Sequence, residues 1–186
     1  MRSAHTMVIA TAAAVLLVAP QARADAWVSP WAGVNFGSRV NDGRTALGLD
    51  AGGMGAGVFG GELDFGYSPS FFGTSTDFGN NTVVDVMANI IIGVPIGGTH
   101  GVGVRPYVTG GVGLIRSQID GGTLFDVKTS KNDFGFNLGG GVMGFMSDHF
   151  GLRGDLRYFR TTNNSFANLG LGQMKFWRIS GGLVFR

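Results

Sequence analysis

Hydrophobic and polar residues alternate with a period of two along most of the chain, from about residue 26 onward. In residues 82–94, Asp85 and Asn89 lie on one face, and the other face holds Val84, Val86, Ala88, Ile90, Ile92 and Val94. Successive side chains of a β-strand point to opposite faces, so this period predicts strands rather than helices. Eight segments follow the pattern: 26–37, 45–54, 59–71, 82–95, 102–117, 132–146, 150–162 and 173–186.

The connections between these segments alternate in length. Longer, polar connections cover 38–44, 72–81, 118–131 and 163–172, and shorter ones lie near 55–58, 96–101 and 147–149. An even number of strands with alternately short and long connections predicts an all-β fold, an eight-stranded antiparallel transmembrane up-and-down β-barrel. The long connections are then expected to be extracellular, and both chain ends to lie on the short-turn side.

The alternation alone also fits a soluble sheet whose apolar face is its core. In an outer-membrane barrel the sense is inverted, because apolar residues face lipid and polar residues line the interior. The length of the predicted strands favours the membrane, since soluble strands average 5–6 residues. Aromatic residues near the segment ends favour it too, as an interfacial girdle. The predicted interfacial aromatics are Tyr67, Phe71, Phe72, Phe134, Tyr158, Trp177 and Phe185.

Charged residues on the inward parity form a predicted interior cluster. In FGLRGDLRYFR (150–160), charged residues occupy every second position. Because buried charges need partners, we interpret the cluster as a structural plug of ion pairs, with a proton or ion relay as the alternative. The cluster comprises Glu62, Asp64, Asp85, Arg105, Arg153, Asp155, Arg157 and Arg178.

The first 24 residues have the features of a secretory signal peptide. Arg2 precedes an uncharged apolar run, Val8–Val18, and Ala22-Arg23-Ala24 is an A-x-A cleavage pattern. The run is too short for a spanning helix, which needs about 20 residues. We therefore expect residues 1–24 to be removed during export, and residues 25–186 to form one barrel domain in the cell outer membrane.

Composition excludes several classes of protein. The chain has 14 Lys+Arg and 12 Asp+Glu, and a leader carrying Arg2 and Arg23 accounts for the basic excess. No nucleic-acid partner is therefore predicted. With no cysteine, the chain has neither a disulfide framework nor a thiolate metal site. No cofactor or metal site is expected, and outer-membrane lipid is the predicted surrounding.

Other motifs are better explained by structure than by chemistry. Arg153-Gly154-Asp155 spells an adhesive tripeptide, but it falls inside a predicted strand rather than at a loop tip. His100 and His149 fall in short connections without an evident Ser-His pair, so no enzyme activity is predicted. Two glycine patterns fit the dinucleotide fingerprint but precede no helix. They are Gly55-x-Gly57-x-x-Gly60 and Gly139-x-Gly141-x-x-Gly144.

Four segments carry a resemblance to a known family: AWVSPWAGVNFG (26–37), VRPYVTGGVGL (104–114), FGLRGDLRYFR (150–160) and ISGGLVF (179–185). They resemble small OmpA/OmpX-type outer-membrane β-barrels across essentially the whole mature chain. The resemblance implies assembly by the barrel assembly machinery through the C-terminal strand. Members usually end on an aromatic residue, whereas Arg186 follows Phe185 here, and no peptidoglycan-binding domain follows the barrel.

The expected function is a structural or surface-interaction role, with the ligand of the long loops left open. A narrow porin-like channel is the first alternative. A soluble exported β-barrel that binds a small apolar ligand is the second. A lipid-modifying barrel enzyme is disfavoured by the positions of the histidines.

Overall fold

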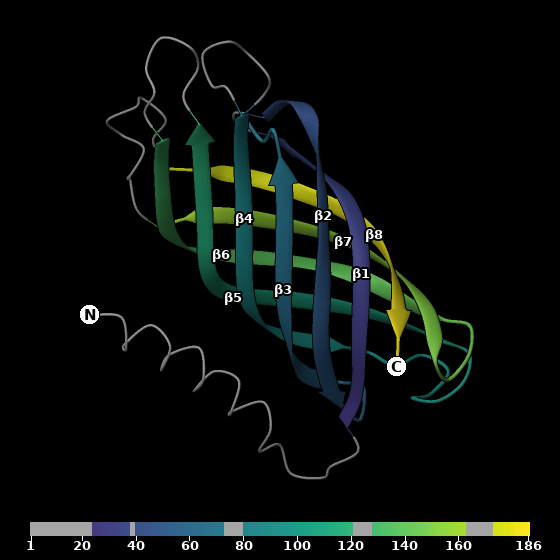
Figure 1. Ribbon diagram of the computed structural model, residues 1–186. Coiled ribbons are helices and arrows are strands. Elements are labelled where there is room, and N and C mark those ends of the chain that lie inside the picture. Colours follow the sequence, from purple (N-terminus) through teal and green to yellow (C-terminus); the bar gives the residue numbers. More distant parts are fainter. Residues whose placement is uncertain (1–23, 38–39, 73–79, 121–127, 163–172) are drawn as a thin grey trace, which may run out of the picture.

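The computed structural model describes residues 24–37, 40–72, 80–120, 128–162 and 173–186. These residues form one closed antiparallel barrel, in which each strand pairs with the next and β8 pairs with β1 (Figure 1). The strands are β1 (Ala24–Gly37), β2 (Val40–Gly55), β3 (Phe59–Pro69), β4 (Asn80–Gly93), β5 (Gly103–Asp120), β6 (Lys128–Phe145), β7 (Phe150–Thr161) and β8 (Lys175–Phe185). The predicted eight-stranded fold is confirmed.

Closure of the barrel gives the backbone N–H and C=O groups of every strand a neighbouring strand to bond. The strands are 11 to 18 residues long, and a tilted strand of about 9–11 residues crosses a bilayer. A closed sheet has no free edge, which is the condition for β-structure inside hydrocarbon. No helix in the described part of the chain is long and apolar enough to cross a membrane.

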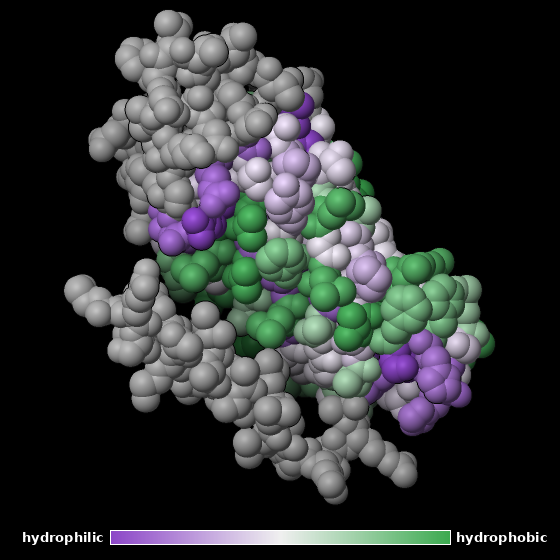
Figure 2. All heavy atoms as spheres, in the orientation of Figure 1, coloured by the Kyte–Doolittle hydropathy of each residue, from purple (hydrophilic) through white to green (hydrophobic). Residues whose placement is uncertain are grey.

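The outer wall of the barrel is apolar. Ile90 is 57% exposed and Leu138 is 64% exposed, and many other large apolar side chains point outward with them. Figure 2 shows hydrophobic residues gathered across the middle of one face, with hydrophilic residues toward its two ends. A soluble protein rarely exposes an apolar surface of this extent, so the wall is suited to lipid.

Glycine makes room for the inward-facing tryptophans of β1. A Cβ at Gly48 would collide with the Trp31 ring, and one at Gly52 would lie 2.7 Å from the Trp27 ring. These tryptophans lie across the inner face of β2, where no side chain occupies the space. The glycine-rich second segment is therefore a strand, and β2 extends beyond the predicted residues 45–54.

The end of β3 corrects one prediction. Strand β3 stops at Pro69, and Ser70 has a positive φ of 51°. This turn breaks the period of two, so Phe71 is only 2% exposed and points into the barrel. Phe72 is partly buried against the same interior residues. The prediction that Phe71 belongs to an outward aromatic girdle is wrong, because the alternation ends before it.

Candidate functional site: a buried charge network

Eight charged side chains meet inside the barrel and form what we call the central network. They come from β2, β3, β4, β7 and β8, and each is at most 7% exposed. Each occupies an inward parity position, which follows from the alternation of its strand. The central network comprises Asp50, Glu62, Asp64, Asp85, Arg153, Asp155, Arg157 and Arg178.

Arg157 joins opposite walls of the barrel. It extends from β7, and its Nη2 lies 2.8 Å from Oε1 of Glu62 on β3. Its Nη1 lies 3.1 Å from Oδ2 of Asp64, also on β3. Its Nε donates to Oδ1 of Asp155 at 2.8 Å. Strands β3 and β7 stand four apart in a ring of eight, so this guanidinium bridges the full width of the lumen.

Arg153 lies four residues before Arg157 on β7, nearer the short turns, and makes a second set of contacts. Its Nη2 is 2.6 Å from Oε2 of Glu62, and its Nη1 is 3.1 Å from Oδ2 of Asp50. Its Nε donates to the Tyr107 hydroxyl at 2.7 Å, and its guanidinium lies 4.9 Å from the centre of that ring. Bonds of this kind to charged groups are the stronger ones in proteins.

Arg178 completes the network from β8. Its Nη1 lies 3.0 Å from Oδ1 of Asp85 on β4, and its Nη2 contacts Asp64 on β3. The guanidinium also lies over the Trp31 ring at 4.3 Å and the Phe159 ring at 4.4 Å. Arg178 therefore ties the seam between β8 and β1 to the opposite wall.

Carboxyl groups outnumber guanidinium groups in the central network by five to three. Neutral donors supply further hydrogen bonds to the carboxyls. The indole of Trp31 donates to Asp50 at 3.2 Å, the amide of Asn89 donates to Glu62 at 3.2 Å, and the Tyr107 hydroxyl contacts Asp155. These donors partly offset the desolvation of the additional carboxyls.

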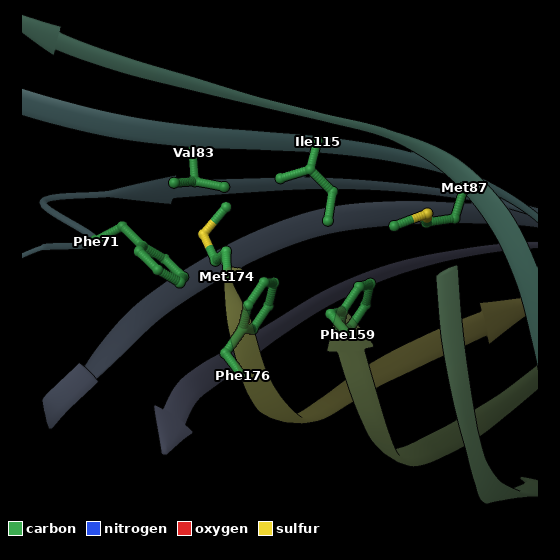
Figure 3. Close-up of a cluster of buried hydrophobic side chains, with 7 residues drawn as sticks. All are labelled: Phe71, Val83, Met87, Ile115, Phe159, Met174 and Phe176. Carbon is green, nitrogen blue, oxygen red and sulfur yellow. The ribbon is translucent and has the colours of Figure 1, made fainter. Parts of the chain in front are cut away.

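Two apolar clusters lie above and below the central network. The loop-side cluster fills the barrel at the end of the long connections, and its side chains point toward one another in Figure 3. It consists of Phe71, Val83, Met87, Ile115, Phe159, Met174 and Phe176. The turn-side cluster fills the other end and consists of Trp27, Met54, Ile91, Tyr107, Met143, Phe145 and Val184. The charges therefore lie between two apolar layers.

A smaller set of charges closes the short-turn mouth. Arg105 Nη2 lies 2.6 Å from Oδ2 of Asp25, and Arg186 Nη1 lies 3.2 Å from the same oxygen. Arg186 also donates to the carbonyl oxygen of Thr99 at 2.8 Å. Both guanidiniums lie over the Phe145 ring, at 5.1 Å and 3.6 Å. Arg105 was predicted within the interior cluster, but it belongs to this mouth, below the turn-side cluster.

The two histidines of the described residues also lie at the short-turn mouth. His100 and His149 line a cavity of about 850 Å³ together with Asp25, Asp148 and Arg186. Across the described residues, no three or more His, Cys, Asp or Glu side chains are arranged to hold a metal ion.

The predicted aromatic residues other than Phe71 and Phe72 point outward. Tyr67, Phe134 and Phe185 are 42%, 47% and 46% exposed. Tyr158 and Trp177 form a pair on β7 and β8 with ring centres 5.2 Å apart.

Sequence reasoning missed Asp50, Trp31 and Tyr107 as members of the site. Asp50 and Met54 are both even-numbered residues of β2, and the even-numbered side chains of this strand point inward. This alternation could have identified Asp50 as an interior residue. The glycines around Asp50 obscured it. The alternation implied that Trp31 and Tyr107 point inward. It could not predict their hydrogen bonds to the charged groups.

A closed antiparallel barrel that is apolar outside and carries paired charges inside is a transmembrane barrel of the outer-membrane type. A family model described as outer membrane protein beta-barrel domain matches residues 9–184. The chain belongs to this outer-membrane β-barrel family. A comparison with curated proteins finds no match.

Solved structures share the fold at low sequence identity. Neisserial surface protein A matches with a TM-score of 0.65 and 14% identity, over 87% of this chain and 96% of that one. The N-terminal barrel of Pseudomonas aeruginosa OprF matches with a TM-score of 0.52 and 16% identity, over 86% of this chain and 95% of that one. Ail of Yersinia pestis, solved with the heparin analogue sucrose octasulfate, matches with a TM-score of 0.51 and 13% identity, over 86% of this chain and 97% of that one.

Proposed function

We propose that this protein is a non-enzymatic outer-membrane anchor whose interior is closed to solutes and whose long connections face the cell exterior for contact with other molecules. The observation that carries the proposal is the set of ion pairs between opposite walls. Arg157 joins β7 to β3, and Arg178 joins β8 to β4. A solute moving along the barrel axis would have to break these bridges.

The apolar clusters strengthen the closure. An eight-stranded barrel is just wide enough for side chains to fill its interior. A hydrated ion would need to pass the loop-side cluster, the central network and the turn-side cluster in turn. This layering favours a structural plug over the proton or ion relay and over the narrow porin-like channel.

The exposed apolar wall disfavours a soluble barrel that binds an apolar ligand. Such a protein would place its apolar residues inside and its charges outside, the reverse of the arrangement of Leu156 and Arg157. A surface-interaction role draws support from Ail of Yersinia pestis, a barrel of this fold that was solved with a heparin analogue. The ligand of the present chain is left open.

Export and assembly form part of the same proposal. Residues 1–24 are removed as a signal peptide, and residues 25–186 enter the membrane as the barrel domain. The barrel assembly machinery recognises the C-terminal strand, β8. The long connections are extracellular, because outer-membrane barrels carry longer loops on that side.

Planar-bilayer recording of the purified, refolded protein tests the closed interior. We expect no stable conductance steps from the wild-type barrel. A general porin recorded in the same bilayers is the positive control for conductance. Large stable steps from the wild type would contradict the proposal and favour the channel.

A further inference from the structure

The charged residues of the outer wall are unevenly distributed. Among outward-facing strand side chains that the structure describes, the charged ones are Arg116, Arg160 and Lys175. All three are basic and lie near the long connections, on β5, β7 and β8. The described outward side chains of β1 to β4 are uncharged. Among these described side chains, the β5–β8 half of the wall therefore carries a basic rim, whereas the β1–β4 half carries no charge.

Arg160 and Lys175 are direct cross-strand neighbours on β7 and β8. Two like charges at this spacing repel each other. Arg160 donates hydrogen bonds from Nε and Nη2 to Oε1 of Gln173, at 3.2 Å and 2.7 Å. Gln173 is neutral, so these bonds leave the positive charge of Arg160 in place. The pair therefore forms a concentrated positive site that an external anion would stabilise.

An aromatic pair adjoins this basic pair on the side of the membrane centre. Tyr158 and Trp177 are also cross-strand neighbours, two residues from Arg160 and Lys175 along each strand. Two residues of a strand span about 7 Å. The basic pair thus stands at headgroup height over rings of the type that mark the membrane interface.

A hollow in the apolar wall continues from the aromatic pair. It has a volume of about 490 Å³. Gly140 faces outward between β5 and β7 without a side chain, and a Cβ there would lie only 2.9 Å from the carbonyl oxygen of Tyr107. Glycine thus keeps the floor of the hollow open. The hollow is lined by Leu138, Gly139, Gly140, Leu156, Tyr158 and Trp177.

We propose that the β6–β8 wall holds one phosphorylated lipid, with its phosphate between Arg160 and Lys175 and an acyl chain laid over Tyr158 and Trp177 into the hollow. Arginine and lysine both bind phosphate, and basic residues near a membrane surface select anionic lipids. The occupant is a lipid rather than a free phosphate, because the hollow beneath the basic pair is apolar. Only the assignment of this lipid to the outer leaflet rests on the proposed function, because it follows from the extracellular position of the long connections.

Trp177 reports on this site directly. The chain has 3 tryptophans, and Trp27 and Trp31 are 3% and 6% exposed inside the barrel. Brominated acyl chains quench tryptophan on contact, so quenching reports on lipid beside Trp177. The refolded protein is placed in phosphatidylcholine vesicles that contain a minor fraction of dibrominated phosphatidic acid or of dibrominated phosphatidylcholine. We expect stronger quenching by the brominated phosphatidic acid.

Charge variants identify the contacts. Replacing Arg160 and Lys175 by glutamine should lower the preference for phosphatidic acid by roughly thirtyfold, as two basic residues near an anionic surface imply. Arg116→Gln is the matched control, since Arg116 lies at the same end but on β5. It should keep the preference. Gel mobility of unheated samples verifies that each variant folds.

Equal quenching of the wild type by the two brominated lipids would overturn the proposal. So would an equal loss of preference in Arg116→Gln, because the attraction would then be general rather than local. If the double variant does not fold, competition in the wild type decides. Unbrominated phosphatidic acid should restore Trp177 fluorescence where unbrominated phosphatidylcholine does not, and equal recovery with both would refute a site.

Discussion

Leu156 and Arg157 are adjacent residues in opposite environments. Leu156 is 42% exposed on the outer wall, whereas Arg157 is 2% exposed in the central network. One step along β7 therefore separates hydrocarbon from a set of carboxylates. Removing the charge at Arg157 and introducing one at Leu156 therefore test the inner and the outer face of the same strand.

Arg157→Leu should destabilise the barrel. The change removes one of the guanidinium partners of Glu62, Asp64 and Asp155, and loss of one partner of a buried pair costs about 3–5 kcal/mol. Glu62→Gln in the same chain should recover part of the loss, because it removes one underpaired carboxylate. Urea titration of the protein refolded in lipid measures the free energy of unfolding.

In phosphatidylcholine without an anionic lipid for the Arg160–Lys175 pair to bind, Arg160→Leu is the matched control for that experiment, because it removes the same side chain from the loop-side end of the same strand. Its hydrogen bonds go to the neutral Gln173, and surface substitutions usually change stability by within about 0.5 kcal/mol. An Arg157→Leu variant as stable as the wild type, with no coupling to Glu62→Gln, would refute the central network.

Leu156→Arg should destabilise the barrel for the opposite reason. An arginine on the lipid face costs roughly 2–4 kcal/mol near the midplane of the bilayer and less toward its surface. Leu156→Met, which keeps the volume and the apolar character, should have little effect. The same urea titration in lipid applies. An unchanged unfolding free energy for Leu156→Arg would show that this face of β7 does not lie in hydrocarbon.

At the scale of residues, parity predicts which way a side chain points but not what it meets. It indicated the inward side of Arg157 because β7 alternates strictly. It could not show that Arg105 pairs with Asp25 rather than with the acids of the central network, since height along the barrel depends on the stagger between strands. The positive φ of Ser70 turns Phe71 into the barrel, and a periodic pattern cannot predict such a turn.

At the scale of elements, the sequence predicts every strand, with ends that differ by a few residues from those of the structure. The largest difference is in β2, which begins at Val40 rather than at residue 45. Glycine has low strand propensity, so a glycine-rich segment is a weak signal. The inward tryptophans of β1 supply the packing that those glycines lack.

The predicted direction of the connections can be tested with epitope tags. A tag inserted after Asn164, in the long connection 163–172, should bind antibody on intact Gram-negative cells. A tag inserted after Gly98, in the short connection between β4 and β5, should bind only after the outer membrane is permeabilised. A periplasmic marker detected by its own antibody controls for leakage. The reverse labelling would invert the topology.

At the scale of the whole molecule, the closed barrel could be predicted and the layering of its interior could not. Period two reports which residues point inward, but not which of them lie at the same height. Met87 and Ile91 alternate with Asp85 and Asn89 on the inner face of β4, yet they belong to different apolar clusters. Registers between all neighbouring strands were needed to separate them.

Extraction and processing test the whole-molecule assignment. The mature protein should begin at Asp25, and it should leave the membrane fraction only with detergent, because its outer wall is apolar. N-terminal sequencing and fractionation measure these properties. Unheated and boiled samples should also differ in gel mobility. Release together with periplasmic contents would support the soluble exported barrel instead.

The order of the charges along the chain has a consequence for biogenesis. Asp50, Glu62, Asp64 and Asp85 belong to β2 to β4, whereas all three arginines of the central network belong to β7 and β8. A sheet that lacks either group of strands holds charges without their counterions, and it must keep them in water. Pairing of β8 with β1 closes the ring and brings the two sets of charges together, so neutralisation of the lumen should coincide with closure of the barrel, whichever end of the chain assembles first.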